Sequence, residues 1–489
     1  MQNLTQYGRD GERKCRGHVW RCALALCAFA AGAAAQQVEI SVSPTPVGSG
    51  ARAAGMADAF VAIADDATAA SWNPAGLVQL ERPEISVVGA WNGIQDELDA
   101  RDHPEFGGQH WGDNAGLNYL SAVYPLPFLV FGKNCVASIN YQRKYDFTRR
   151  FSFDYTTPAV LSTGQVLNRM LQVEFEQTGG LGAISPAFAF ELTQRLSLGI
   201  TLNLWRSTLF AENGWENETD QQLFTLLGSS TRWGRTFLRE EYHDFTGENV
   251  TLGALWTPGD HWSFGLRYDS AFTGDVDYEA RGHTMSLRLP SVPQPRLIFT
   301  TTPMLRKENR KLRFPESIAL GAAYRVNDKL TFSFDVTRTD WDDFYLEEGS
   351  GLRRSPVDFS IIDNPLTKPN IDPTYSLRCG VERVLIPKQL DEKLGHLWTL
   401  RGGLFFDQEP ATHRSSGFHW LDDRGSGLPD DFVGAALGAG LQLNQRVNLD
   451  CAYQLRYGKG VNSDFIIGVR DFKEDVMQHR FLASIIVYF

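Results

Sequence analysis

The chain has 489 residues and a net charge of −11, and 43% of its residues are hydrophobic. The acidic residues gather in short stretches and the sequence shows no broad basic surface, which excludes nucleic acid as an expected partner. The length alone would suit about three soluble domains, but no Pro/Gly/Ser-rich linker divides the chain, so one large unit is favoured.

Residues 1–35 have the pattern of a signal peptide. Five basic residues precede the apolar run 22–31, and Ala33, Ala34 and Ala35 form a small-x-small cleavage site. A membrane-spanning helix needs roughly 20 apolar residues, and neither this run nor any later stretch provides them. We therefore predict export, with Gln36 as the first residue of the mature chain.

The C-terminal residues alternate in character, as expected for a strand. Phe481, Ala483, Ile485, Val487 and Phe489 share one parity. Since a strand has a side-chain period of two, one face can meet lipid while the other lines a polar lumen. A closed barrel also leaves no backbone N–H or C=O group without a hydrogen bond inside the bilayer. The ending is typical of the closing strand of a bacterial outer-membrane barrel, and Phe489 is the expected signal to the barrel-assembly machinery.

Further alternating segments predict an all-β fold, a transmembrane antiparallel β-barrel of about fourteen strands over residues 83–489. Clear examples are 196–204, 330–337 and 447–457, where apolar and polar residues alternate strictly. The predicted strands are 83–94, 115–125, 133–153, 171–193, 195–210, 236–257, 261–280, 313–326, 329–345, 373–387, 396–408, 430–444, 446–460 and 476–489.

The connections between these strands alternate between short and long. Barrels of this class have tight turns on the periplasmic side and long loops on the extracellular side. We therefore predict that both termini lie in the periplasm. The links expected to be long extracellular loops are 95–114, 211–235, 281–312, 346–372, 409–429 and 461–475.

Residues 36–82 do not read as barrel strands. The segment is rich in Ala and Gly and predicts short helices, the first over 51–59. Asp65 or Asp66 suits the N-cap of a second helix, and Asn73 suits the N-cap of a third that begins at Pro74. Small side chains allow such helices to pack inside a narrow lumen.

The motifs of this segment carry a family resemblance. Gly50-Ala51-Arg52-Ala53-Ala54-Gly55-Met56, Ala62-Ile63-Ala64-Asp65-Asp66-Ala67 and Trp72-Asn73-Pro74-Ala75-Gly76 resemble the N-terminal hatch of the FadL/TodX (OmpP1) family of outer-membrane long-chain fatty-acid and hydrocarbon transporters. The resemblance implies a hatch at 36–82 inside the barrel. The expected hatch and gating residues are Asp65, Asp66, Asn73, Pro74 and Ala75.

The resemblance also implies passive transport of long-chain fatty acids or similar hydrophobic compounds across the bacterial outer membrane. In that family the ligand enters from the extracellular loops, the hatch rearranges, and the ligand leaves sideways into the membrane beside a kinked third strand. Arg143 and Lys144 interrupt the alternation of the third predicted strand. Either a kink or bulge repairs the conflict, or Arg143 already lies at the membrane interface and snorkels.

Two predicted loops, 211–235 and 281–312, are apolar for exposed segments. One interpretation is a surface groove that captures the hydrophobic ligand. The other is that these residues only pack the loops against one another over the barrel mouth. The groove residues would be Leu223, Phe224, Leu226, Leu297 and Phe299.

Four arginines, Arg267, Arg325, Arg378 and Arg401, are candidates to point inward because their neighbours on the other parity are apolar. They could neutralise a ligand carboxylate, or pair with wall and hatch carboxylates. We favour a structural network for each of them.

Other functions fit the sequence less well. A general diffusion porin has an equally polar lumen, but a plug at 36–82 contradicts an open pore; a structural or adhesive barrel is a further alternative. An enzyme is not expected, since the histidines are scattered and no serine motif stands out. We predict no metal and no cofactor, and a monomer whose partners are hydrophobic small molecules, outer-membrane lipid and the assembly machinery.

Overall fold

The computed structural model describes residues 46–100, 105, 107–129, 132–160, 166–208, 212–227, 230–289, 298–354, 372–386, 396–410, 429–461 and 472–489. The predicted signal peptide lies outside these residues.

In this part of the chain, fourteen strands form one closed antiparallel barrel. Strand β20 pairs with β1 and so closes the ring, with Glu84 opposite Tyr488. The predicted fold class is confirmed. In order around the ring the strands are β1 (Glu84–Ala100), β2 (Gly108–Pro125), β3 (Cys135–Asp146), β5 (Val166–Thr193), β6 (Leu196–Trp205), β8 (Ser230–Trp256), β9 (Trp262–Asp269), β12 (Ser317–Asn327), β13 (Leu330–Thr339), β16 (Thr374–Leu385), β17 (His396–Glu409), β18 (Asp430–Leu443), β19 (Val447–Val461) and β20 (Phe472–Tyr488).

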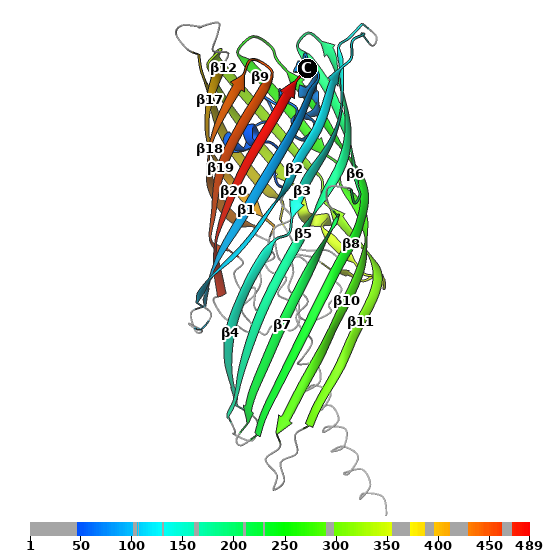
Figure 1. Cartoon of the computed structure of the whole chain (residues 1–489), viewed down its shortest axis with the longest axis vertical. Helices are drawn as coiled ribbons and strands as arrows, with labels where there is room; N and C mark the ends of the chain where they lie inside the picture. The colour runs from blue at the N-terminus through cyan, green and yellow to red at the C-terminus, as the bar shows by residue number, and fades with distance from the viewer. Residues whose placement is uncertain are drawn as a thin grey trace, which may run out of the picture. The chain divides into compact units, whose positions relative to one another are not determined.

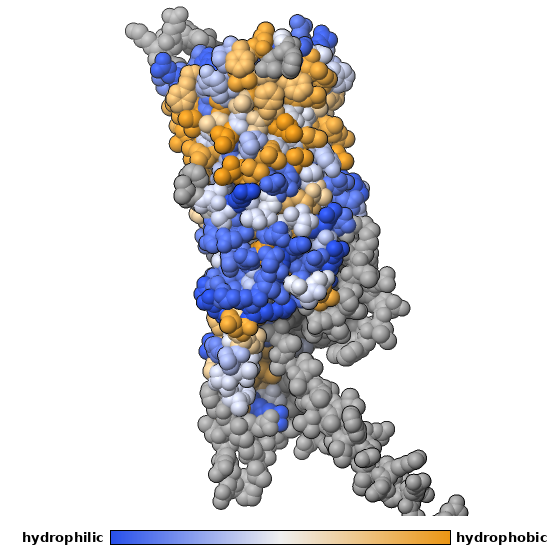
Figure 2. Space-filling model, turned by 90° about the vertical axis from the view of Figure 1, so that its right-hand side faces the viewer, coloured by the Kyte–Doolittle hydropathy of each residue, from blue (hydrophilic) through white to orange (hydrophobic). Residues whose placement is uncertain are grey.

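The alternation read from the sequence assigns the two faces of the wall correctly. On β13, Phe332 and Phe334 are exposed on the outside, whereas Ser333 and Asp335 are buried inside. On the face that Figure 2 shows, apolar residues gather in a belt across the end of the barrel at which the C-terminus lies, with hydrophilic residues beyond it. Such a belt is what a bilayer requires of a barrel wall.

Several strands run on past the ring and form an extended sheet (Figure 1). The prediction of loops over 211–235 and 281–312 was wrong, because these residues complete hairpins that lengthen the sheet. Two predicted strands, 133–153 and 261–280, were also wrong as single strands, since each divides in two. The strands outside the ring are β4 (Arg149–Val160), β7 (Gly214–Leu227), β10 (Phe272–Leu289), β11 (Ile298–Phe314), β14 (Tyr345–Glu347) and β15 (Arg353–Arg354).

A cluster of buried aromatic side chains joins the extended sheet to the barrel. Trp215 stacks on Tyr242 with 4.3 Å between ring centroids, and Trp205 stacks on Phe272 at 5.0 Å. Arg310 is fully buried beside them, with its guanidinium 3.4 Å from the Tyr278 ring centroid. Stacking and cation–π contacts of this kind hold the base of the sheet rigid.

The N-terminal segment (residues 46–82) contains the short helices α2 (Ala51–Gly55), α3 (Ala69–Trp72) and η2 (Pro74–Gln79); a further turn, η4 (Trp341–Asp343), follows β13. The predicted helix over 51–59 was too long, because Ala57 and Asp58 take the left-handed conformation, with φ of 56° and 60°. Among the described residues no helix is long and apolar enough to cross a membrane.

Candidate functional site

The N-terminal segment lies within the barrel, near the end of the barrel at which the C-terminus of the chain lies (Figure 1). Its alanines are almost fully buried and pack on inward-facing residues of the wall. Wall side chains also donate hydrogen bonds to its backbone carbonyls, so these buried acceptors are satisfied. These bonds are Tyr119 Oη to Ala67 at 2.9 Å, Ser263 Oγ to Ala62 at 2.7 Å, Thr201 Oγ1 to Ala70 at 2.8 Å and Ser197 Oγ to Ala75 at 3.0 Å.

Inward-facing glycines of the wall allow the segment to make backbone-to-backbone contact. A Cβ on Gly199 would lie 2.6 Å from the Pro74 carbonyl oxygen, and one on Gly380 would lie 2.5 Å from that of Met56. Real Cβ atoms do not approach so closely, so these positions require glycine. The glycines that contact the segment in this way are Gly199, Gly253, Gly265, Gly321, Gly380, Gly403 and Gly438, which we call the glycine belt.

The predicted cap at Asn73 is present. Its Oδ1 accepts a hydrogen bond from the Ala75 N–H at 3.2 Å, with Pro74 as the first residue of η2. Its Nδ2 donates to the carbonyls of Val61 at 2.9 Å and Ala254 at 3.0 Å. Asn73 therefore joins two parts of the segment to β8. The position requires an amide because the side chain both accepts and donates hydrogen bonds.

Asp65 and Asp66 lie beside Arg52 of α2, which links the segment to the wall. Arg52 pairs with Asp65 and, at 2.9 Å, with Glu382 of β16. Asp66 does not cap α3 as predicted; its Oδ1 instead binds the N–H and hydroxyl of Thr68 in a turn. Burial raises the pKa of the Asp66 carboxyl, and Arg52 opposes that rise.

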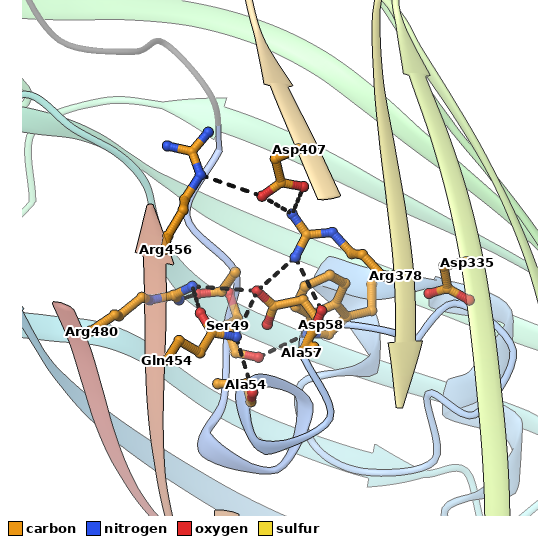
Figure 3. A network of polar contacts seen from close by, with 12 residues as sticks. Ser49, Ala54, Ala57, Asp58, Asp335, Arg378, Asp407, Gln454, Arg456 and Arg480 are labelled. Carbon is orange, nitrogen blue, oxygen red and sulfur yellow. Dashed lines mark hydrogen bonds and ion pairs between the residues drawn. The ribbon is translucent and has the colours of Figure 1, made fainter. Parts of the chain in front are cut away.

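A second ionic contact centres on Asp58, which the sequence did not single out (Figure 3). Its Oδ2 lies 3.2 Å from Arg378 Nη1, 3.2 Å from Gln454 Nε2 and 3.5 Å from Arg480 Nη1. Arg378 also donates to Asp407 at 2.8 Å. Asp58 has a left-handed backbone conformation. No sequence pattern predicts this conformation for an aspartate, so sequence analysis could not identify the contact.

The four predicted arginines occupy different environments. Arg401 is buried between Glu382 and Asp450. Arg267 pairs with Asp269 at 3.0 Å. Arg325 has the inward parity of Ala319 and Ala323, but it lies beside the β12–β13 turn, where its side chain is exposed.

Two cavities share the Asp58–Arg378 pair in their lining. One, of about 120 Å³, is lined by Lys144, Tyr145, Arg267, Asp269 and Trp341 among others. The other, of about 130 Å³, is lined by Arg456 and Arg480 among others. Pro46, Val47, Asp58 and Arg378 line both, and each is smaller than the roughly 300–1,000 Å³ of a ligand pocket.

Strand β3 is irregular at Arg143 and Lys144. Its register against β5 shifts between Arg143 and Tyr145. Lys144 reaches inward to Asp269 at 3.3 Å, and its carbonyl accepts a hydrogen bond from the Val47 N–H at 2.7 Å. The pairing of β2 with β3 ends at Tyr119, although β2 itself begins at Gly108. Beyond Tyr119, β2 lies against β4, where a Cβ on Gly112 would lie 3.4 Å from the Arg150 backbone nitrogen. That this part of the wall serves as an opening remains a prediction.

The predicted capture residues lie on strands and not on loops. Phe224 and Leu226 are exposed on one face of β7, whereas Leu223 points to the other face because side chains alternate. Leu297 lies outside the described residues, and for Phe299 the structure describes only its backbone in β11.

Phe224 belongs to a row of apolar residues on neighbouring strands, which the sequence did not predict. Each residue in it stands directly opposite the next on the neighbouring strand, so all share one face. We call it the apolar row; it consists of Met170 (β5), Phe224 (β7), Trp233 (β8) and Leu287 (β10), with Phe299 next in register on β11.

Two further points concern the predicted site list. Phe489 is exposed on the outside of the wall. Within the described residues, His243, Asp244 and Asp277 place possible ligand atoms within 4.8 Å of one another, on the exposed face of the extended sheet and away from the lumen.

Comparison with known proteins finds similar solved structures. A Pseudomonas aeruginosa FadL homologue aligns with 91% of this chain and 99% of its own, with a TM-score of 0.53 and 16% identity. A deletion mutant of the monoaromatic hydrocarbon channel TodX aligns with 90% of this chain and 99% of its own (TM-score 0.51, 12% identity). The Pseudomonas putida toluene transporter TodX aligns with 87% of this chain and 94% of its own (TM-score 0.50, 12% identity).

Neither a protein-family model nor a curated protein matches the sequence. The predicted resemblance is nevertheless confirmed in the fold, over about nine tenths of the chain. The protein has the barrel fold of the FadL and TodX channels.

Proposed function

We propose that this protein is a passive outer-membrane channel for hydrophobic compounds, with long-chain fatty acids as the first candidates. The observation that carries the proposal is the N-terminal segment packed across the lumen of a closed barrel through the glycine belt. An open diffusion pore has no use for such a plug. Proteins with this fold include a FadL homologue and a toluene transporter, which supports the same class of cargo.

In this proposal, residues 1–35 are a signal peptide, 36–82 are the hatch and 83–489 are the barrel. The apolar belt faces lipid, both termini lie in the periplasm, and the extended sheet stands on the extracellular side. Phe489 is read by the barrel-assembly machinery, and the protein acts as a monomer without catalytic activity. The tight turns on the side of the termini support this orientation.

The apolar row begins the proposed route. Met170 is 42% and Phe224 39% exposed, on a sheet that stands clear of the apolar belt. Four inter-strand spacings give the row a length of about 19 Å, so an extended hydrocarbon chain can lie along it. Contact with such a row favours an apolar ligand by about 25 cal/mol for each Å² removed from water.

The proposed route ends beside β3. The segment around Val47 is bound to Lys144 at the bulge, next to the stretch where β2 has left β3. Moving this segment, together with a separation of β2 from β3 and β4, would join the lumen to the surrounding lipid. Lateral release spares the ligand an aqueous crossing, which costs about 0.8 kcal/mol for each methylene.

The test compares proteoliposomes that contain the full chain with proteoliposomes that contain a variant lacking residues 36–76. We expect the full chain to pass palmitate and exclude sucrose, and the variant to leak sucrose. The barrel should remain heat-modifiable in both, which shows that it is folded. Free passage of sucrose and no uptake of palmitate by the full chain would identify a diffusion porin, and passage of neither would favour a structural or adhesive barrel.

The capture step has its own prediction. Replacing Phe224 and Leu226 together with aspartate is expected to lower palmitate uptake several-fold at low ligand concentration, because two charges replace apolar contact area. Leu305 is 70% exposed on β11 but lies outside the apolar row, so Leu305→Asp is the control and should leave uptake unchanged. Equal uptake by all three proteins would assign the apolar residues to packing alone.

A further inference from the structure

We propose that the Asp58 carboxylate occupies an anion site built by the barrel wall, and that the carboxylate of an incoming amphiphile displaces it and releases the hatch. The inference rests on the proposed function and deepens it, because it names the ligand class as anionic amphiphiles. It concerns the polar network in Figure 3.

The donors of this site belong to the barrel, whereas the acceptor belongs to the N-terminal segment. Arg378 on β16, Gln454 on β19 and Arg480 on β20 converge on one oxygen of Asp58, at 3.2, 3.2 and 3.5 Å. Asp407 holds the other side of Arg378 through two bonds of 2.8 and 3.0 Å. The site is therefore preformed, and charge-assisted donors of this kind bind any carboxylate that can reach them.

Asp58 fills the site imperfectly. It is 5% exposed, yet its Oδ1 has no hydrogen-bond partner among the described residues. Both Asp58 and the preceding Ala57 have positive φ, a conformation that costs free energy for residues with a Cβ. The carboxylate of a free ligand carries no such backbone strain. It therefore competes with Asp58 for the same donors without that free-energy cost.

The geometry also provides access. Asp58 and Arg378 line both lumen cavities, so a head group that enters either one meets the pair. Phe405 lies beside Arg378, with the guanidinium 5.4 Å from its ring centroid, and also lines one cavity. By contrast, Arg401 is enclosed by Glu382 and Asp450 and lines neither.

The consequence for gating is that two ligands with the same alkyl chain but different head groups should differ in their effect on the hatch. When Asp58 leaves without a replacement, Arg378 and Arg480 lose a shared counter-charge, which is unfavourable because their side chains are only 15% and 14% exposed. A carboxylate restores that charge, whereas an alcohol does not. Differential affinity for the open state is what allows a ligand to shift the equilibrium.

The experiment measures amide hydrogen exchange of residues 51–60 in the full chain in lipid nanodiscs, with palmitate, with hexadecanol and without ligand. Uptake of both ligands into proteoliposomes is measured in parallel. We expect palmitate to speed exchange about tenfold or more and hexadecanol to leave it unchanged. The Asp58→Asn substitution keeps the shape of the side chain, and asparagine tolerates the left-handed conformation. In this variant the amides of residues 51–60 should exchange fast without any ligand.

The control is Asp220→Asn, which removes an aspartate bound to Arg235 on the extended sheet, outside both cavities. It should behave as the unmodified chain in every condition. Equal responses to palmitate and hexadecanol, or slow exchange in ligand-free Asp58→Asn, would overturn the inference. If palmitate enters the vesicles under either of those results, the proposed function stands without the Asp58 mechanism; if palmitate does not enter at all, the proposed function itself fails.

Discussion

Replacing Arg52 with methionine is expected to destabilise the docked N-terminal segment by about 3–5 kcal/mol, because Asp65 and Asp66 lose the cation that they share, whereas Glu382 keeps Arg401. Arg52 is the cation shared by Asp65, Asp66 and Glu382, and the Asp66 and Glu382 side chains are 6% and 12% exposed. Methionine keeps an unbranched apolar stem in place of the arginine methylenes, so the loss reports mainly on the guanidinium charge and its hydrogen bonds.

Hydrogen exchange of the amides in α2 measures this loss directly. The control is Arg206→Met, since Arg206 and Glu248 form a pair at 3.4 Å in which the side chains are 63% and 61% exposed. An exposed pair contributes at most about 1 kcal/mol, and Arg206 lies outside the N-terminal segment. Equal exchange in the two variants would mean that Arg52 does not anchor the segment.

Replacing Gly199 with alanine is expected to displace η2 from the wall and to open the barrel to small hydrophilic solutes. The added methyl would lie 2.6 Å from the Pro74 carbonyl oxygen, so backbone must move. Overpacking of this kind costs about 1–3 kcal/mol, and here the cost falls on the closed arrangement alone. Sucrose leakage from proteoliposomes is the measurement.

Gly402→Ala is the matched control, because its Cβ would lie 3.7 Å from the nearest neighbour, the Ala436 carbonyl oxygen, in ordinary contact. It should remain tight to sucrose, and both variants should stay heat-modifiable. If Gly199→Ala is as tight as Gly402→Ala, the glycine belt is not what seals the barrel.

The barrel was predictable because strand periodicity is a local property. Ser333 and Asp335 on β13 could be placed inside, and Phe332 and Phe334 outside, from their order alone, since a lipid-facing charge is costly. The fourteen strands of the ring correspond one by one to predicted segments, with errors only at their ends and in the two merged cases. The Asn73–Pro74 turn was equally local, because a cap needs only its own neighbours.

The extended sheet was not predictable in the same way. Its strands carry polar residues on their exposed faces, as in Glu216, Glu218 and Asp220 of β7, so their composition resembles that of loops. Their pairing depends on β5 and β8 continuing past the barrel, which periodicity does not encode. The apolar row therefore emerged only when register brought Met170, Phe224, Trp233 and Leu287 side by side.

The sequence by itself determined that this chain forms a closed barrel with inward polar and outward apolar faces and a small-residue N-terminal segment, because these features follow from the order of neighbouring residues. Tertiary structure alone decided which wall glycines meet that segment, and that Asp58 takes a strained conformation among Arg378, Gln454 and Arg480. The Asp58 contacts join residues more than 300 positions apart, and their geometry is set by barrel closure, which no local pattern records.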